Sequence, residues 1–317
     1  MKRTLWIGLT AAVICALLYP RGADAQDQRR LARMVLPVLK IDHGARMAGM
    51  GGAFVAVSDN IDAIFSNPAG LTHIERAAFT LGYTRWLMND HILTGGMAYN
   101  TAYGVLGVNV VTFSPHEFEE TTIFQPTGTG RYPDMGDLSL GVVYARKLTD
   151  KLSVGSMFRW TQQTLDTDRL NAWDVGVSTF FYTGFRSLRL GMTFENMGKD
   201  VKVIDDVRKM PVAFSTAAAM EIVGATGDPT YITVTFENSY ATDFADPQYR
   251  FGGELWLQNN FALRAGYKAN FDEESWTLGA GLKFSMPNGR IVQADVAYSD
   301  FGTYLDAPLR FTLSGAF

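Results

Sequence analysis

The sequence is poor in several features that mark common protein classes. Cysteine occurs once in 317 residues, and only 4 histidines are present. Charged residues make up 19% of the chain, below the roughly 25% typical of a soluble domain. The 28 basic residues are outnumbered by 32 acidic ones, which gives a formal net charge of −4. These shortages argue against a disulfide scaffold, a cysteine-based metal site and a nucleic-acid-binding surface.

Long hydrophobic runs are also missing beyond the N-terminus. The basic pair Lys2 and Arg3, the apolar run Leu5–Leu18 and the small residues Ala23 and Ala25 predict a signal peptide over residues 1–25. Cleavage near Ala25 would remove the single cysteine; an uncleaved anchor is the alternative. Export without a later transmembrane helix leaves a soluble exported protein or an outer-membrane barrel.

What the chain has in abundance is alternation. From residue 77 to 317, apolar residues alternate with glycine, small or polar residues in about fourteen segments of about ten residues, a length that suits tilted membrane-crossing strands. The expected strands start near residues 77, 91, 103, 136, 151, 171, 185, 211, 229, 247, 260, 275, 290 and 308. The sequence therefore predicts an all-β fold, a 14-stranded antiparallel transmembrane β-barrel over residues 77–317. A soluble β-sandwich is the alternative.

The connections and the C-terminus support the barrel. Short turns follow the even strands, and longer connections follow most odd ones, the longest being Pro115–Met135 and Met197–Met210. Outer-membrane barrels combine short periplasmic turns with long external loops. The terminal Phe317 closes an amphipathic strand and resembles the signal read by the barrel assembly machinery. We therefore expect this machinery and outer-membrane lipid as partners, and the outer membrane of a Gram-negative-type bacterium as the location.

Residues 41–76 do not alternate and are rich in small residues. Close backbone packing and turns are favoured by Gly44, Gly49, Gly51 and Gly52. Asn67 and Pro68, followed by Ala69, predict a turn after a short helix over residues 60–65 that Ser58 and Asp59 would cap. We expect this segment to form a plug in the barrel lumen, and residues 26–40 to form a periplasmic N-terminal extension.

Four stretches carry a family resemblance. The runs Gly44–Ala56 and Asp62–Leu71 resemble the N-terminal motif of the FadL superfamily of 14-stranded outer-membrane barrels. The same two runs look more closely like its PorV/PorQ branch, which the stretch Glu195–Gly198, followed by Met210 and Pro211, and the stretch Asn259–Tyr267 also resemble.

The resemblance implies two alternative functions. PorV-like members receive secreted proteins that carry a C-terminal sorting domain, in type IX secretion. FadL-type members instead pass hydrophobic molecules through a plugged barrel, and there the plug around Asn67 would shift to open an exit. A structural barrel without a transport role is a third possibility.

Strand parity predicts which charges face the lumen. The basic and acidic sets nearly balance, which favours an interior closed by ion pairs over a selective open pore. The main candidates are Arg159, Asp174, Glu195, Arg250, Glu254, Arg264, Lys283 and Asp295. Large apolar inward residues are few, which weighs modestly against ligand uptake. No histidine has metal-ligand spacing and no Gly-x-Ser-x-Gly motif occurs, so we expect no metal, no cofactor and no enzymatic activity.

The long connection Pro115–Met135 carries aromatic residues among polar ones. Phe118, Phe124 and Tyr132 are candidates for contact with a protein partner at the outer surface. The alternative is that this loop folds back as a lid over the barrel mouth.

Overall fold

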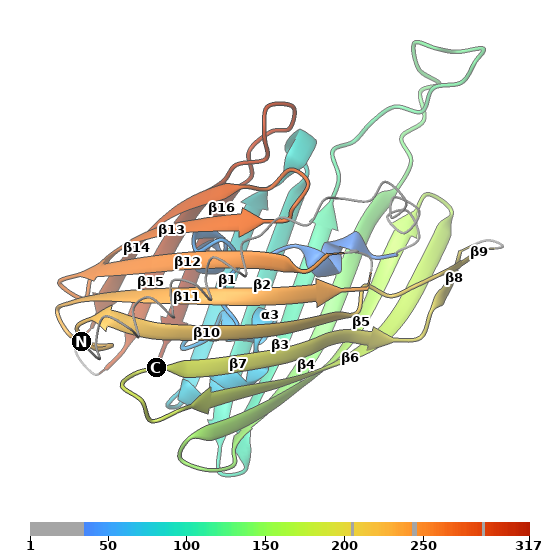
Figure 1. Cartoon of the computed structure of the whole chain (residues 1–317). Helices are drawn as coiled ribbons and strands as arrows, with labels where there is room; N and C mark the ends of the chain where they lie inside the picture. The colour runs from blue at the N-terminus through green and yellow to red at the C-terminus, as the bar shows by residue number, and fades with distance from the viewer. Residues whose placement is uncertain (1–34, 204–205, 243–245, 287–288) are drawn as a thin grey trace. The chain divides into compact units, whose positions relative to one another are not determined.

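The computed structural model describes residues 35–203, 206–242, 246–286 and 289–317, all within one compact unit, Arg33–Phe317. Fourteen antiparallel strands close into a single barrel, in which β1 pairs with β16 (Figure 1). The barrel strands are β1 Ala77–Arg85, β2 His91–Thr101, β3 Gly104–Ser114, β4 Met135–Lys147, β5 Leu152–Leu165, β6 Asp168–Tyr182, β7 Arg189–Gly198, β10 Ala213–Val223, β11 Thr230–Ala241, β12 Gln248–Leu257, β13 Phe261–Ala269, β14 Trp276–Ser285, β15 Ile291–Ser299 and β16 Leu309–Ala316. The predicted fold class is confirmed, and each expected start lies within four residues of the observed one.

The alternation places apolar residues on the outer wall of the barrel. In β2, Leu93, Met97 and Tyr99 are exposed, whereas Thr94 and Ala98 on the opposite face are buried. The same pattern recurs around the barrel, with leucine, valine and aromatic residues outside. An apolar outer wall of this kind is stable only against lipid, and it leaves the polar faces of the strands to line the lumen.

The two ends of the barrel differ in the length of their connections. One end, here called the short-turn end, has connections of two to six residues, such as residues 102–103 and 258–260. The other, the loop end, carries the segment 115–134, which rises away from the barrel (Figure 1). It also carries a small hairpin, β8 Val201–Val203 and β9 Asp206–Arg208. The connection between β5 and β6 is an exception, because only Asp166 and Thr167 separate these strands.

Short helical elements of the plug pack against the inner wall. They are α2 Ala45–Gly49, α3 Ala63–Ser66 and the 3₁₀ helix η3 Pro68–His73. Helix α3 is shorter than expected: Ser58 donates a hydrogen bond to the Phe54 carbonyl, and Asp59 pairs with Arg46, so neither residue caps the helix. A further 3₁₀ turn, η4 Leu87–Asn89, lies in the first loop. None of the helices in the described ranges is long and apolar enough to cross a membrane.

The N-terminal arm, defined here as residues 35–41, requires a correction. It was expected in a periplasmic extension over residues 26–40, but its described part packs inside the loop end of the barrel. The 3₁₀ helix η2 Pro37–Lys40 lies in this arm, and Val38 packs with Ile92 and Val111. Apolar side chains drive the arm into the lumen, where water is excluded. The signal peptide and residues 26–34 lie outside the described residues.

Candidate functional site

The plug, residues 44–74, is fixed to the barrel through its backbone. The amides of Ala45, Gly51 and Val55 donate hydrogen bonds to Thr312 Oγ1 at 2.8 Å, Thr277 Oγ1 at 2.9 Å and Glu237 Oε2 at 3.1 Å. Each acceptor is an inward-facing side chain of a different strand. Buried backbone amides need such partners, so the polar inner wall replaces the water that the plug gives up.

Glycines of the wall let the plug approach at backbone distance. A Cβ added to Gly266 would stand 2.1 Å from the Gly51 nitrogen, and one on Gly155 would stand 2.3 Å from the Ala69 nitrogen. Gly191, Gly252 and Gly279 meet the plug backbone in the same way. The alternation in the sequence places glycine among the small and polar residues of the strands, but it gives no sign of what these glycines contact. Because they have no side chain, the backbone of residues 49–69 can pack directly against the inner wall.

The predicted plug glycines occupy positions with clear steric demands. Gly44, with φ of 98°, precedes α2, and Gly49 packs against the backbone of Gly279. Gly51 and Gly52 have φ of 67° and 76°, in the left-handed region that favours glycine. A Cβ on Gly52 would also meet the Asp42 carboxylate at 2.6 Å. All four residues lie where the plug turns or touches its surroundings.

The Asn67–Pro68–Ala69 turn is an anchor. The Asn67 amide donates to the carbonyls of Val55 at 2.8 Å and Thr179 at 3.1 Å, and its oxygen accepts from the Ala69 amide at 3.1 Å. Ala69 also donates to Ser178 Oγ at 3.0 Å. Asn67 and Ala69 are fully buried. Movement here would break four hydrogen bonds, so the expected shift around Asn67 is not favoured by this geometry.

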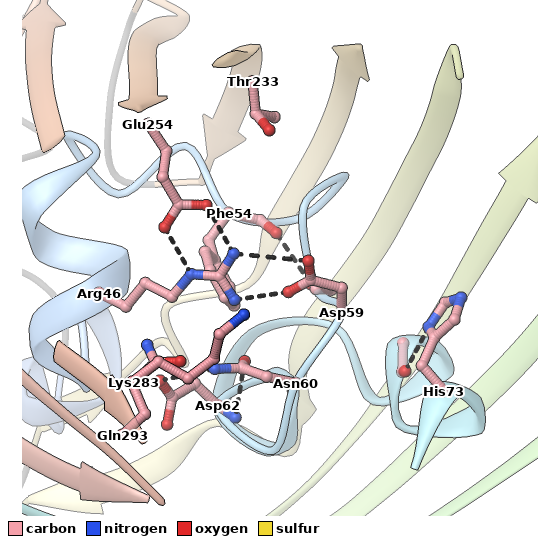
Figure 2. Close-up of polar contacts among 12 residues, drawn as sticks. Arg46, Phe54, Asp59, Asn60, Asp62, His73, Thr233, Glu254, Lys283 and Gln293 are labelled. Carbon is pink, nitrogen blue, oxygen red and sulfur yellow. Dashed lines mark hydrogen bonds and ion pairs between the residues drawn. The ribbon is translucent and has the colours of Figure 1, made fainter. Parts of the chain in front are cut away.

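A buried ion-pair chain ties α2 to the barrel (Figure 2). Arg46 donates to both oxygens of Glu254, at 2.9 and 2.7 Å, and to Asp59 at 2.5 Å. Glu254 also accepts from Arg264 at 2.7 Å, and Arg264 donates to Asp295 at 2.7 Å. Bidentate, charge-assisted bonds are strong where water is excluded. The strand charges were anticipated, whereas Arg46 and Asp59 were not, because parity does not apply outside strands.

The remaining predicted lumen charges lie in separate groups. Arg159 pairs with Asp174 at 2.9 Å and also contacts Asn196. Arg250 pairs with Glu237 at 3.1 Å. Lys283 donates to Asn259 and lies 4.4 Å from the Trp256 ring centroid. Glu195 differs: within the described part of the chain its carboxylate makes neither a hydrogen bond nor an ion pair.

Two ionisable residues, one directly before the plug and one within it, have shifted pKa values. Burial, and after it the positive charge of the nearby Arg159, lower the pKa of His43 to about 4. Burial, followed by repulsion from Asp295, raises the pKa of Asp62 to about 6. Asp62 accepts a hydrogen bond from Thr80 at 2.9 Å. His43 is therefore neutral at pH 7, and packs edge-on against Phe65.

A cavity of about 200 Å³ lies between the plug and the inner wall. Phe65 and Ser66 line it from the plug, His43 lines it from the residue before the plug, and Glu195 and Arg250 line it from the strands. It was not anticipated from the sequence, because no pattern indicates where a plug fails to fill a lumen. The described residues contain no cluster of three or more side chains suited to hold a metal ion.

The barrel wall is interrupted at one place. The β7–β10 ladder ends at Glu195 and Ala213, although β7 continues to Gly198, and the β6–β7 register shifts between Val175 and Val177. Beyond the ladder, the Asn196 side chain bonds the Pro211 carbonyl at 2.8 Å.

Apolar side chains fill this interruption from both sides of the wall. On the lumen side, Met210 packs with Val35, Leu36 and Ala172, and Val212 joins them. A groove of about 1050 Å³ lies at the same place and is lined by Ala172 and Val212 among others, and by Phe158, Trp173 and Phe194. Ala172 and Val212 thus belong both to the apolar cluster on the lumen side and to the lining of the groove.

The candidate partner residues lie on the projecting loop. Phe118 and Tyr132 are 52% and 58% exposed, and Phe124 near the tip is 94% exposed. Arg131 holds the base of the loop through Asp166, at 2.5 Å. The loop therefore does not fold back as a lid over the barrel mouth.

Comparisons with known proteins agree on the architecture. The model of the "Uncharacterised protein family (UPF0164)" matches residues 9–135. A search of curated proteins gave no match. Among solved structures, the CymD monoaromatic hydrocarbon channel is 14% identical with a TM-score of 0.60, over 86% of this chain and 97% of that one. The Pseudomonas putida toluene transporter TodX is 11% identical with a TM-score of 0.60, over the same shares.

A Pseudomonas aeruginosa FadL homologue is 12% identical with a TM-score of 0.52, over 90% of this chain and 99% of that one. Identities this low show the fold alone. The fold resembles those of transport channels. The chain thus has a closed 14-stranded barrel fold similar to that of these solved structures, and its N-terminal part is similar to the UPF0164 family.

Proposed function

We propose that the chain is an outer-membrane channel for small hydrophobic molecules, in a Gram-negative-type bacterium after signal cleavage near Ala25. The interrupted wall carries this proposal. An apolar solute that enters the lumen needs an exit that avoids water, and the gap between β7 and β10 is closed by apolar side chains rather than a hydrogen-bonded ladder.

The N-terminal arm would control this route. Val35 and Leu36 cover the lumen side of the gap through apolar contacts with Met210 and Ala172. Among the described residues, one backbone hydrogen bond joins this end of the arm to the wall, from the Val35 amide to the Lys209 carbonyl at 3.3 Å. A hydrophobic solute can replace such contacts at little cost, whereas it cannot replace the ion pairs that hold α2.

The fold similarity supports the same direction. The similar solved structures include channels described for monoaromatic hydrocarbons and toluene. Resemblance at this level supports a hypothesis about function only together with local geometry. Here the local geometry is the set of apolar side chains that separates the lumen from the outer groove at the interrupted wall.

Uptake of a radiolabelled monoaromatic hydrocarbon tests the proposal. The chain would be expressed in Gram-negative cells that lack channels of this kind, and the initial uptake rate should rise. Met210→Gln places an amide in the apolar gap and should lower the added uptake about tenfold. Met286→Gln, at an exposed site in a short turn, is the matched control. An unchanged uptake rate on expression of the wild type contradicts the proposal.

A second candidate is a PorV/PorQ-type role in type IX secretion. Exposure of Phe124 and Ile123 at the tip of the projecting loop favours it, because exposed apolar loop residues suit contact with a protein. The partner would be a secreted protein with a C-terminal sorting domain. Co-purification from native membranes, with and without residues 117–132, tests it. Recovery of the same proteins by both forms would rule out the loop as the docking site.

We propose that the barrel assembly machinery inserts the chain into the outer membrane, where lipid then surrounds the barrel. Phe317 stacks against Phe79 on the outer wall, with ring centroids 6.0 Å apart, and is 47% exposed. This leaves the terminal ring available to the barrel assembly machinery and afterwards to lipid. Removal of Phe317 should lower the amount of folded barrel in the outer membrane without changing synthesis.

A further inference from the structure

The cavity beside the plug is large enough for a one-ring molecule. Its volume is about 200 Å³. An engineered apolar cavity of about 150 Å³ in another protein accommodates benzene. The two differ in lining, because polar and charged side chains surround most of this one. Its ligand would therefore have a polar group as well as an apolar body.

Several buried polar atoms around the cavity lack partners within the described chain. They are His43 Nδ1, Ser66 Oγ, Gln248 Nε2 and Arg250 Nε. His43, Ser66 and Gln248 are 9%, 8% and 4% exposed, so all three are at least nine-tenths buried. Unsatisfied buried polar atoms are costly, and structures rarely keep them without a reason. A ligand that supplies hydrogen bonds here would satisfy them.

The charges around the cavity restrict the polar group of that ligand. Asp42 is paired with Lys268 at 2.7 Å, and Glu237 with Arg250 at 3.1 Å. Glu274 also contacts Lys268. Glu195 alone of these carboxylates has no partner in the described residues. A ligand carboxylate would lie beside this second carboxyl group, and two neighbouring carboxylates repel each other.

Other head groups satisfy only part of the site. An ammonium group would pair with Glu195 but could not accept from Arg250 Nε or Gln248 Nε2. A hydrocarbon would leave every one of these atoms unpaired. A hydroxyl group donates to a carboxylate and accepts from an N–H, so it meets both needs. Phe65, Met47 and Val55 line the same cavity and provide an apolar surface for a ring.

We propose that this cavity is a binding site for a small molecule with one apolar ring and one hydroxyl group. The inference rests on the proposed channel function, and it adds a preference for hydroxylated aromatics within the proposed substrate class. Glu195 accepts the hydroxyl proton in a hydrogen bond, and Gln248 and Arg250 donate to the hydroxyl oxygen. Acids with the same ring are excluded by Glu195.

Three probes with one ring test the proposal: benzyl alcohol, toluene and benzoate. Binding to the full mature chain in lipid nanodiscs would be measured by ligand-observed NMR, with empty nanodiscs subtracted. Benzyl alcohol should bind at least about tenfold more tightly than either of the other two, because it alone satisfies donor and acceptor together. Equal binding of toluene and benzyl alcohol would overturn the proposal, as would no binding of any probe.

Variants assign the binding to this cavity. Glu195→Gln should weaken benzyl alcohol about fivefold to tenfold, because a neutral acceptor is roughly half as strong as a charged one, and should narrow the difference from benzoate. Ala241→Leu, which fills the cavity, should weaken all binding. Glu117→Gln, on the exposed loop, is the control. Unchanged selectivity in Glu195→Gln contradicts the assignment.

The outcome is separable from that of the channel proposal. If benzyl alcohol binds as expected but expression never raises hydrocarbon uptake, the channel proposal fails and the binding site stands. If uptake rises but toluene binds as well as benzyl alcohol, the channel proposal stands and the hydroxyl preference is wrong.

Discussion

The plug and the N-terminal arm lie in the same lumen but are held by different forces. The plug, residues 44–74, is fixed by hydrogen bonds from its backbone to Thr312, Thr277 and Glu237, and by the Arg46 ion pairs. The arm, residues 35–41, is held mainly by apolar contacts.

Directional bonds fix one geometry, whereas apolar contacts tolerate exchange for another apolar group. The arm also covers the interrupted wall between β7 and β10. We therefore expect the arm to be the element that moves, and the plug to stay fixed to the barrel wall.

The largest expected effect comes from closing the space between plug and wall. Gly266→Ala should destabilise the folded barrel by more than about 3 kcal/mol, because its Cβ would overlap the Gly51 nitrogen and neither backbone can yield easily. The matched control is Gly176→Ala on β6, where a Cβ would make only ordinary contacts, at 3.7 Å or more. Urea midpoints from tryptophan fluorescence give the comparison. Similar midpoints for both variants would mean that the plug is not seated as described.

The next effect is expected from the ion pairs of α2. Arg46→Ala leaves Glu254 with one cation fewer and Asp59 unpaired, and should cost about 3 kcal/mol because breaking buried pairs is expensive. It should also raise single-channel conductance in planar bilayers, as the plug loosens. Arg131→Ala removes an exposed ion pair and should lower the urea midpoint far less, because solvent screens such pairs. If Arg131→Ala lost much stability and Arg46→Ala lost little, the Arg46 ion pairs would not be what holds α2 to the barrel.

A smaller effect is expected from pH, with opposite signs at two plug-segment residues. His43 has its pKa lowered to about 4, so it contributes full stability above about 6.5, and this is lost as pH falls towards 4. Asp62 has its pKa raised to about 6, so the protein is most stable below about 3.8 and loses stability as pH rises towards 6. In the wild type the two trends oppose each other.

Variants separate the two trends. Asp62→Asn should be less stable at pH 4.5 than at pH 6.5, and His43→Asn should show the reverse, each by about 2 kcal/mol. Urea midpoints at the two pH values measure this. If both variants shift in the same direction, the burial of one of the two residues is misassigned.

The smallest effect is expected outside both regions, on the projecting loop. Phe124→Ala removes a ring that is 94% exposed and should change stability by less than about 0.5 kcal/mol. Hydrocarbon uptake should also stay unchanged, because the Phe124 ring is exposed to solvent on the projecting loop. A drop in uptake would show that the loop belongs to the entry route.

The sequence predicts the barrel well because alternation is a local property. Each strand carries its own inside and outside, so strands such as β2 and β13 can be assigned without knowing their neighbours. Which strand residue meets which plug residue depends on closure of the barrel. The contact of Gly266 with Gly51 therefore left no local trace.

The arm shows the limit of this approach. Val35, Leu36 and Val38 form a short apolar stretch with no period, which fits an extension as well as a buried segment. The bulge in β7 at Asn196, where φ is 59° and the β6–β7 register shifts, is likewise not visible in the alternation pattern of the sequence. Both features depend on long-range contacts, and both lie where the proposed route passes.

Hydrogen exchange of the full chain in lipid nanodiscs tests the central claim most directly. The amides of Leu36 and of residues 38–41 should exchange at least about 100-fold faster than those of Ala45, Gly51 and Val55, because an arm held by apolar contacts opens locally while the plug stays bonded to the wall. Equal protection of the two regions, or faster exchange in the plug, would contradict the account.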